Sequence, residues 1–386
     1  MPQTIDEINN KIKTNKAQVL TASEAKILIK EKGIKHFSEN IDIVTCATFE
    51  INTNAFLYLS FGQTDPLIYF MDASINDIPA CITGPTDVII SSVSSSKNNI
   101  EYSGSSIVED LVCKKDLHLK AAGRNLEVFP AKEFETWFNL KDLNYARLFL
   151  NQAINQNSIV AANSGDKDIN SNMGTLIAKL ENSTFNSSSY LNPLINDPAC
   201  KTIGTGTNIW VAGSRGVILG HGSNHNPSQH KNKHNIPVGP STTLSLFVDI
   251  ENMHPKWIRG GFIKSFGPVL YVGIGIPIPV LNDEIAEHLA ITDDMINTTI
   301  IDFSIPRRSK PILGQCTYNE LRTSTVLINN KPTLTASLSS MAYAFEICKT
   351  LKEEILNRNF LLAEPSIPIN MNGEFKKLDS RLSEFV

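Results

Sequence analysis

Apolar positions near the N-terminus recur with the spacing of a helix. Isoleucines stand every three to four residues from Ile5 to Ile12, which indicates a helix with one apolar face. Thr-x-x-Glu boxes at 4–7 and 21–24 precede this pattern and the next one, and such boxes satisfy the first N–H groups of a helix. We therefore expect two short helices at this end of the chain, the second ending near Gly33.

Farther along, apolar residues fall into continuous or alternating runs that are typical of buried strands. The runs that predict strands lie at 41–49, 56–61, 67–71, 80–90 with a break at Gly84-Pro85, 118–122, 244–250 and 269–280. The segments 318–328 and 331–335 flank Asn329-Asn330 and predict a hairpin. A return to three- and four-residue spacing predicts helices over 104–112, 137–154, 283–289 and 337–357, the last with the clearest apolar stripe.

The stretch from Ile203 to Pro227 is the most distinctive in the chain. Its glycines stand at 204, 206, 213, 216, 220 and 222, and its polar end holds His221, Asn224, His225 and Asn226. Two short apolar runs between the glycines suggest two strands that meet at glycine turns, with polar side chains at the mouth of a site. The alternative interpretation is a glycine-rich strand turn with solvated histidines.

Alternation of strands and helices at these lengths predicts an α/β or α+β fold, with mixed sheets and flanking helices. Without a low-complexity linker, the chain is expected to form one compact unit over 1–370. Two candidate lobes within it cover 1–155 and 156–335, followed by the helix 337–357 and a polar tail at 371–386.

Composition excludes some classes of partner. The net charge of −4 argues against nucleic acid or an anionic membrane surface, and no apolar run reaches membrane-spanning length.

The six cysteines form no CxxC pair, so neither a zinc ribbon nor an iron–sulfur cluster is indicated. The polar N-terminus and scattered cysteines predict reduced thiols in the cytoplasm. Asparagine is abundant, which we interpret as compositional drift.

Few motifs carry chemistry by themselves. The chain holds no GxSxG, P-loop or HExxH pattern. His221 and His225 are four residues apart, but the Asn, Gly and Pro around them argue against a metal-binding helix, so we expect no metal and no cofactor. Cys46 lies in a predicted strand near a turn, where a cation or helix end could lower its pKa; the alternative is a small core residue.

Several long blocks resemble one known family. They read SFGQTDP at 60–66, SIVEDLV at 106–112, MGTL at 173–176, PLINDP and KTIGTGT within 193–207, SNHNP at 223–227, PVGP at 237–240, VGIGIPIPVLNDEIA at 272–286 and IDFSIPRRSKPILG at 301–314. Over residues 4–368 the chain is similar to the homocysteine biosynthesis family. The resemblance implies a sulfur-transfer enzyme that converts aspartate semialdehyde to homocysteine through a cysteine persulfide. It also implies a small-molecule substrate, a sulfur-donor protein and a homo-oligomer.

The departures from the family pattern concern the thiols. By this resemblance the two family cysteines fall at Thr53 and Val128, and a family histidine falls at Ser106. Neither Thr nor Val can hold and release a sulfane sulfur, because that step needs a thiolate. Cys46 is then the best substitute, followed by Cys81 and by Cys200, which directly precedes the glycine-rich stretch.

If the pocket is retained, the resemblance suggests a role for each remaining group. Cys46 or Cys200 would supply the thiol, and His225 would be a general acid or base or would polarise the carbonyl. Substrate-binding groups would be the backbone amides of Gly204, Gly206, Gly273 and Gly275, which could hold a carboxylate or oxyanion, together with Asp65 to orient an amine and Asn226.

Three hypotheses follow for function. The first is a sulfur-transfer enzyme acting on a small aldehyde or amino-acid-like substrate. The second is a diverged relative in a specialised biosynthetic pathway, with non-sulfur-carrying chemistry in the same pocket. The third is a binding protein that has lost catalysis. Whether a thiol lies in the pocket, near His225 and the glycines of 273–275, discriminates between the first two.

Overall fold

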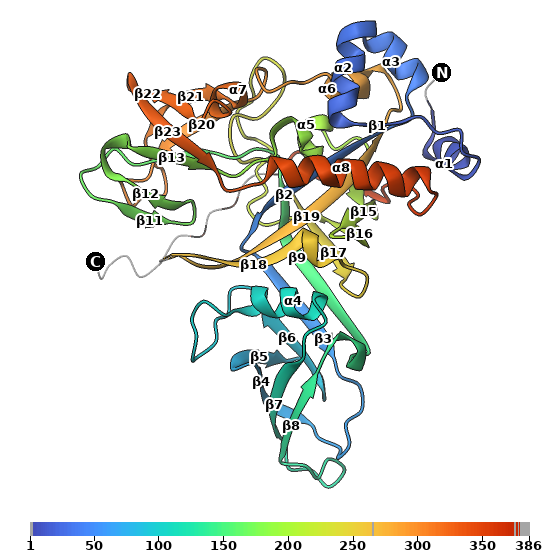
Figure 1. The fold of residues 1–386 in the computed structure, drawn as a ribbon, viewed down its shortest axis with the longest axis vertical. Coiled ribbons are helices and arrows are strands. Elements are labelled where there is room, and N and C mark those ends of the chain that lie inside the picture. Colours follow the sequence, from blue (N-terminus) through green and yellow to red (C-terminus); the bar gives the residue numbers. More distant parts are fainter. Residues whose placement is uncertain (1–2, 265, 374–375, 377, 379–386) are drawn as a thin grey trace.

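The computed structural model describes residues 3–264, 266–373, 376 and 378 (Figure 1). It combines helices with mixed sheets, which confirms the predicted fold class. The α-helices of the described residues are α1 Ile5–Lys13, α2 Ala22–Lys32, α3 Ile34–Asn40, α4 Gly104–Val112, α5 Pro193–Asn196, α6 Asp283–Leu289, α7 Tyr318–Leu321 and α8 Met341–Leu356. Short 3-10 turns are η1 Leu140–Asp142, η2 Ala178–Leu180, η3 Ser189–Leu191 and η4 Pro255–Trp257.

A sheet of 14 strands forms the backbone of the molecule, in the order β1-β2-β19-β15-β16-β17-β9-β3-β6-β5-β4-β7-β8, with β18 also paired to β19. β1 runs parallel to β2, and the other neighbours are antiparallel. The strands are β1 Val19–Thr21, β2 Ile43–Asn52, β3 Ala55–Ser60, β4 Phe70–Ile75, β5 Ile78–Ile82, β6 Asp87–Ser91, β7 Leu117–Gly123, β8 Glu133–Phe138, β9 Tyr145–Asn155, β15 Asn208–Val211, β16 Ser214–His221, β17 Thr243–Asp249, β18 Ile258–Ile263 and β19 Gly267–Pro279.

A second sheet of six strands has its own apolar cluster, which includes Val160, Ile300 and Val326. Its order is β21-β20-β10-β13-β23-β22, and β10–β20 and β13–β23 are parallel pairs. The strands are β10 Val160–Ala162, β13 Asn182–Phe185, β20 Asn297–Asp302, β21 Ile312–Thr317, β22 Thr325–Ile328 and β23 Lys331–Ser337. Two small ribbons complete the structure, β11 Ile169–Ser171 with β12 Gly174–Leu176, and β14 Gly204–Thr205 with β24 Ile367–Pro368.

The longest unbroken pairing in the large sheet is the antiparallel pair β2–β19, near one edge of the strand order. It keeps register over ten residues, from Ile43 opposite Pro279 to Asn52 opposite Leu270. Helix α8 covers this pair, and a Cβ added at Gly273 would lie 2.6 Å from Ile347 Cδ1. A Cβ at Gly275 would lie 3.0 Å from Leu351 Cδ2. These two glycines therefore bring the helix close to the sheet.

Most local predictions at helix ends and turns are confirmed. Both Thr-Glu capping boxes form, and Gly33 ends α2 with a φ of 83°. Asn329 and Asn330 both have positive φ between β22 and β23, as a two-residue hairpin turn of the favoured hand requires. The glycine-rich stretch forms the hairpin β15–β16, as its two apolar runs predicted.

The predicted helix over 137–154 is wrong, because this segment forms the end of β8 and the long strand β9. The register with β17 shifts between Leu244 and Leu246, which pair with Ile154 and Leu150. Residues four apart also share one face of a strand, so the buried Ala146, Leu150 and Ile154 imitate helical spacing. The segment 182–192 contributes β13 and η3.

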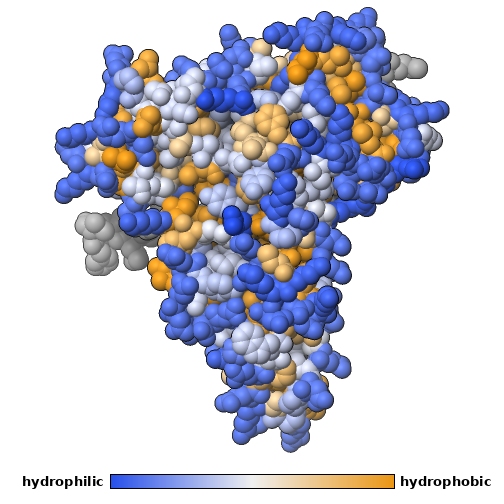
Figure 2. Space-filling model, viewed as in Figure 1, coloured by the Kyte–Doolittle hydropathy of each residue, from blue (hydrophilic) through white to orange (hydrophobic). Residues whose placement is uncertain are grey.

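The molecule is elongated, and strands β3–β8 with α4 form the lower part of Figure 1. Strand β9 runs from this part into the body above. The larger apolar cluster takes residues from both sides of position 155, and the division into lobes at 155/156 stays a prediction. In the same orientation the surface is mostly hydrophilic, with scattered apolar patches (Figure 2). No helix within the described residues is long and apolar enough to span a membrane.

Gly222 fixes the path of the chain where β16 ends. A Cβ there would lie 2.3 Å from the Asn151 carbonyl oxygen and 2.9 Å from that of Leu244, and neither backbone atom can retreat freely. We predict that Gly222→Ala lowers the free energy of unfolding by about 3 kcal/mol, the upper part of the range for overpacking. Ser223→Ala, a control that removes one partly buried hydrogen bond, should cost about 1 kcal/mol or less. Urea denaturation measures both, and equal effects would contradict the steric explanation.

Candidate functional site

A cleft of about 270 Å³ lies where the end of β2 meets β9 and the loop after β16. Its lining is dominated by amide side chains and comes from well separated parts of the chain. The residues are Ile51, Asn52, Thr53, Gln152, Asn155, Asn157, Ser158, Ile159, Asn172, Met173, Asn186, Asn224 and Pro240. None of these described lining residues is ionisable, so the wall is polar but carries no charge.

Hydrogen bonds hold several of these amides in place. Asn52 Nδ2 donates to the Gln152 carbonyl at 2.6 Å, and Gln152 Nε2 donates to Asn155 Oδ1 at 2.9 Å. The buried Asn157 donates to the carbonyl oxygens of Pro237 at 2.6 Å and Asn297 at 3.0 Å. Because their geometry is fixed before a ligand arrives, these groups form a preorganised surface.

Other polar groups of the cleft are free to bind a ligand. Among the described residues, the Thr53 hydroxyl and the Asn172 side-chain amide have no hydrogen-bond partner. The loop that carries Asn224 is anchored, because the Ser223 N–H donates to the Asn151 carbonyl at 2.7 Å and Asn54 Nδ2 donates to Ser223 Oγ at 2.8 Å. The cleft therefore combines a rigid wall with unsatisfied donors and acceptors that can fix the orientation of a small ligand.

A buried carboxyl group lies beside this wall. Glu50 precedes the lining residues Ile51 and Asn52 on β2, and its carboxylate accepts the Ser188 N–H at 2.8 Å. Burial raises the pKa of Glu50 to about 7, although the hydrogen bonds from Ser188 lower it in part. The Tyr318 hydroxyl, whose pKa is raised by burial and by the Glu50 charge, donates to Asn157 Oδ1 at 2.8 Å. Glu50 is thus a group that titrates near neutral pH next to an otherwise uncharged site.

Cys46 and Cys200 do not line the cleft. Cys46 lies in the middle of β2 opposite Ile276, fully buried, and burial raises its pKa to about 12 despite the nearby Lys26 ammonium. Cys200 is also buried, and burial together with the Asp197 carboxylate raises its pKa well above the usual range. Both thiols are protonated at neutral pH and are poor nucleophiles in this arrangement. Cys81 is exposed on β5, in the lower part of Figure 1.

His225 is in the anchored loop, next to the lining residue Asn224, but both of its ring nitrogens are occupied. Nε2 donates to the Asn370 carbonyl at 2.8 Å, and Nδ1 accepts the Thr243 N–H at 3.3 Å. Burial lowers the pKa of His225, and the nearby His221 lowers it further, so the imidazole is neutral at pH 7. Acid–base chemistry at this ring would require one of these hydrogen bonds to break.

The other expected binding groups are engaged elsewhere. The Gly204 N–H donates to Thr207 Oγ1 at 2.9 Å, and the Gly206 N–H donates to the Ile218 carbonyl at 2.8 Å. Gly273 and Gly275 lie inside the sheet beneath α8, away from the cleft lining. A carboxylate or oxyanion would have to displace existing contacts to reach these amides.

Two further predicted binding residues also lie outside the cleft lining. Asp65 is exposed in the loop between β3 and β4. Asn226 follows the anchored loop residues, and its side-chain oxygen accepts a hydrogen bond from Ser228 Oγ at 2.9 Å. A direct role of either residue in substrate binding stays a prediction.

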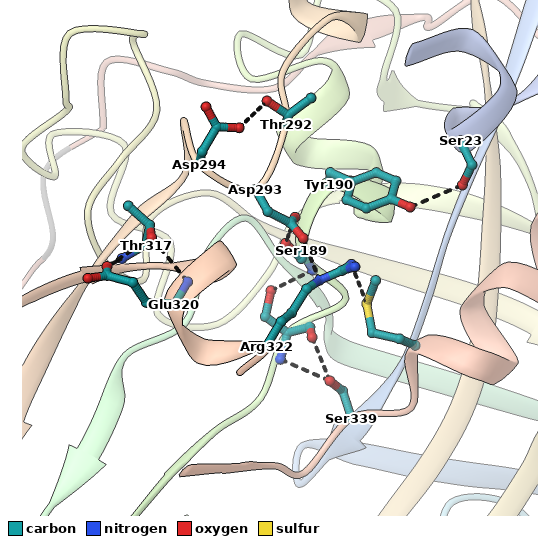
Figure 3. Close-up of polar contacts among 12 residues, drawn as sticks. Ser23, Ser189, Tyr190, Thr292, Asp293, Asp294, Thr317, Glu320, Arg322 and Ser339 are labelled. Carbon is teal, nitrogen blue, oxygen red and sulfur yellow. Dashed lines mark hydrogen bonds and ion pairs between the residues drawn. The ribbon is translucent and has the colours of Figure 1, made fainter. Parts of the chain in front are cut away.

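A second polar cluster, shown in Figure 3, joins α2 to the six-stranded sheet. The carboxylate of Asp293 pairs with the Arg322 guanidinium and accepts a hydrogen bond from Ser189 Oγ. The Tyr190 hydroxyl lies 3.2 Å from Ser23 Oγ on α2. Because these groups satisfy one another and line no cleft among the described residues, we assign the cluster a structural role.

Lys26 extends this cluster towards Cys46. Its Nζ donates to Asn196 Oδ1 at 3.1 Å and to the Leu289 carbonyl at 3.0 Å, and lies 5.3 Å from the centre of the Tyr190 ring. Burial lowers the pKa of Lys26 to about 8, although the Cys46 thiol and Asp293 raise it in part. The ammonium therefore contributes to packing between α2, α5 and α6.

Sequence reasoning missed the amide lining and Glu50. Asparagines at 52, 155, 157, 186 and 224 line one cleft. The abundance of asparagine that we interpreted as compositional drift therefore includes residues of the candidate site. One available signal was the polar residue Glu50 in an otherwise apolar strand pattern, since buried charged groups are rare without a role.

Glu50 makes a testable contribution to pH dependence. Its pKa is raised from 4.5 to about 7 on folding, so the folded chain binds more protons than the unfolded chain between these values and loses stability as pH rises through them. The shift corresponds to about 3 kcal/mol. The variant Glu50→Gln keeps an acceptor for Ser188 but does not titrate. We predict that its free energy of unfolding rises by about this much relative to that of the wild type between pH 4.5 and pH 8. Urea denaturation measures this free energy at each pH. If the prediction is wrong, the free energies of unfolding of the two proteins will change in parallel over this range.

Comparison with known proteins places the chain in a class. A family model described as homocysteine biosynthesis enzyme, sulfur-incorporation, matches residues 17–362. The chain therefore belongs to this family of sulfur-incorporating enzymes, as the sequence blocks indicated. No solved structure matches the chain.

Three curated relatives are similar to the chain over most of its length. The chain is 35% identical over 379 residues to an L-aspartate semialdehyde sulfurtransferase of Methanocaldococcus jannaschii, covering 94% of the chain and 72% of the relative. It is 32% identical to an L-aspartate semialdehyde sulfurtransferase of Methanosarcina acetivorans, covering 97% of the chain and 74% of the relative. An uncharacterised protein of Methanothermobacter thermautotrophicus is 24% identical over 328 residues.

Proposed function

We propose that this chain incorporates sulfur into a small amino-acid-like aldehyde of the aspartate semialdehyde type, and that the amide-lined cleft binds this substrate. The observation that carries the proposal is the origin of the cleft residues. Met173, Asn224 and Pro240 come from three separate sequence blocks on which the family resemblance rests. Thr53, at the position where the resemblance places a family cysteine, lies in the same cleft.

The size and chemistry of the cleft suit such a substrate. Its volume of about 270 Å³ lies at the small end of the usual range for ligand pockets. An amino-acid aldehyde carries a carboxylate, an ammonium group and a carbonyl, which need both donors and acceptors. Amide side chains provide both without a net charge, so they can bind a zwitterion without favouring one of its ends.

We further propose that the sulfur arrives on an external donor and is not carried on Cys46 or Cys200. Both thiols are buried and protonated, and no described lining residue of the cleft is a cysteine. Conversion of the aldehyde to a thiol consumes one sulfide, two electrons and two protons and releases the carbonyl oxygen as water. Sulfide would supply the sulfur directly, and an external reductant the two electrons. From a persulfide-bearing donor protein, the same reductant would supply two further electrons and two protons, which release sulfide and leave the donor as a thiol. Self-association and a cytoplasmic location stay predictions.

The second candidate function is a different reaction of the same substrate class in the same cleft. It is favoured by one observation, namely that Thr53 and not a cysteine lies at the expected sulfur-carrying position. In this case the free Thr53 hydroxyl would orient the carbonyl group and no sulfur would be incorporated.

The donor route predicts a specific pattern of products. Incubation with aspartate semialdehyde, sulfide and a chemical reductant should yield homocysteine, detected by mass spectrometry. Cys46→Ser and Cys200→Ser should retain this activity, and peptide mass spectrometry should show no added sulfur atom on Cys46 or Cys200 of the wild type after treatment with a persulfide donor. A sulfur adduct that is lost in either variant would overturn the donor route, and binding without product would favour the alternative functions.

Thr53 provides a direct test of the cleft. Thr53→Val removes the free hydroxyl at nearly constant volume and should lower kcat/KM by about 2- to 10-fold, the value of one hydrogen bond. Thr53→Ser, the matched control, should remain near wild type. Thr53→Cys should gain a persulfide adduct that the wild type lacks, because this thiol would be partly exposed in the cleft. Unchanged kinetics in Thr53→Val would place the substrate elsewhere.

A further inference from the structure

A second cleft, of about 430 Å³, lies beside the first along β2 and is not used by the proposed reaction. It is lined by Phe49, Glu109, Pro255, Lys256, Arg259, Tyr271 and Tyr343. Phe49 of this cleft and Ile51 of the first are two residues apart on one strand, so their side chains leave the same face about 7 Å apart. In Figure 1 strand β18 lies between α8 above and α4 below.

Three aromatic rings form the wall of this second cleft. Phe49 lies 6.1 Å from Tyr271 with 18° between the ring planes, and 4.7 Å from Tyr343 with 37° between them. Trp257 supports the Tyr343 ring from the side, at 5.8 Å and 83°. The absence of a side chain at Gly261 leaves room for the Tyr271 ring, since a Cβ there would lie 2.9 Å from Tyr271 Cε2. The rings therefore offer a supported aromatic surface that is open to a ligand.

Polar groups lie at the rim. The side chain of Arg259 is 77% exposed, and its contact with Glu109 is long, with Nε 3.9 Å from Oε1. Glu109 is better satisfied by the Gly260 N–H at 2.8 Å, so the guanidinium remains available to an anion. Lys256 adds a second cation, paired with Glu346 at 2.5 Å. Among the described residues, the hydroxyls of Tyr271 and Tyr343 have no hydrogen-bond partner.

We propose that this aromatic cleft binds a planar heteroaromatic ring that bears an anionic group, as in the ring and phosphate of a nucleotide. The ring stacks on the aromatic wall, as bases and flavins stack on Tyr and Phe side chains. The anionic group pairs with Arg259, whose planar guanidinium suits phosphate. A cationic ligand, which aromatic clusters also bind, is a separate outcome of the test, since Glu109 lines the cleft together with Arg259 and Lys256. The proposal is independent of the sulfur chemistry.

Flavin mononucleotide is a suitable probe, because stacking quenches its fluorescence. We expect saturable quenching by the wild-type chain, and heat on titration with AMP in calorimetry. Riboflavin, which has the ring without the phosphate, should bind more weakly. Tyr343→Leu should weaken binding of flavin mononucleotide by about 5- to 100-fold, the range for loss of one stacking partner. Arg259→Gln should weaken it by about 10-fold and leave riboflavin binding unchanged.

Two controls locate the ligand. Arg124→Gln alters an arginine near the Tyr69 ring in the lower part of the molecule and should leave the affinity unchanged. Thr53→Val should also leave it unchanged, which separates the two clefts. Absence of binding by both flavin mononucleotide and AMP would overturn the proposal, as would equal affinities in the wild type and in folded Tyr343→Leu and Arg259→Gln. Binding of tetramethylammonium in place of both nucleotides would assign the cleft to cations and also overturn it.

Discussion

The ten-residue pairing of β2 with β19 is the constraint on which the rest of the structure depends. It places β2 beneath α8 and leads the end of the strand to the amide-lined cleft. Along this one strand the environment changes from the fully buried Cys46, through the titratable Glu50, to the accessible Thr53. A shift of one residue in the register would turn each of these side chains to the opposite face.

Position along β2 also separates the residues that pack in the core from those that can contact a substrate. Cys46, the cysteine of this strand, is in the part of β2 that water does not reach, and Cys200 is buried as well. The open part holds amides and a hydroxyl. A relative of sulfurtransferases with this distribution is expected to bind and orient reactants rather than to carry the sulfur itself, which is why an external donor forms part of the proposed function.

Much of the fold could be predicted from local physics. Capping boxes, the Asn329-Asn330 turn and the β15–β16 hairpin depend on neighbouring residues and are therefore readable in the sequence. Strand β9 was mistaken for a helix because apolar residues four apart share a face in both structures, and the partners β3 and β17 that settle the choice are distant in the sequence. The candidate site was predicted only in part for the same reason. Gly273 and Gly275 are small because α8 packs on them, and the amide lining is assembled from distant segments.

The uncharged wall of the amide-lined cleft has a consequence for the speed of substrate capture. Enzymes with charged clefts attract ionic substrates from a distance, and salt weakens this attraction. A cleft lined by asparagine, glutamine, serine and threonine exerts little force beyond contact. Encounter with a zwitterionic substrate should then proceed at the unsteered diffusional rate. It should depend little on ionic strength, which would let the chain work equally well in dilute and in salt-rich surroundings.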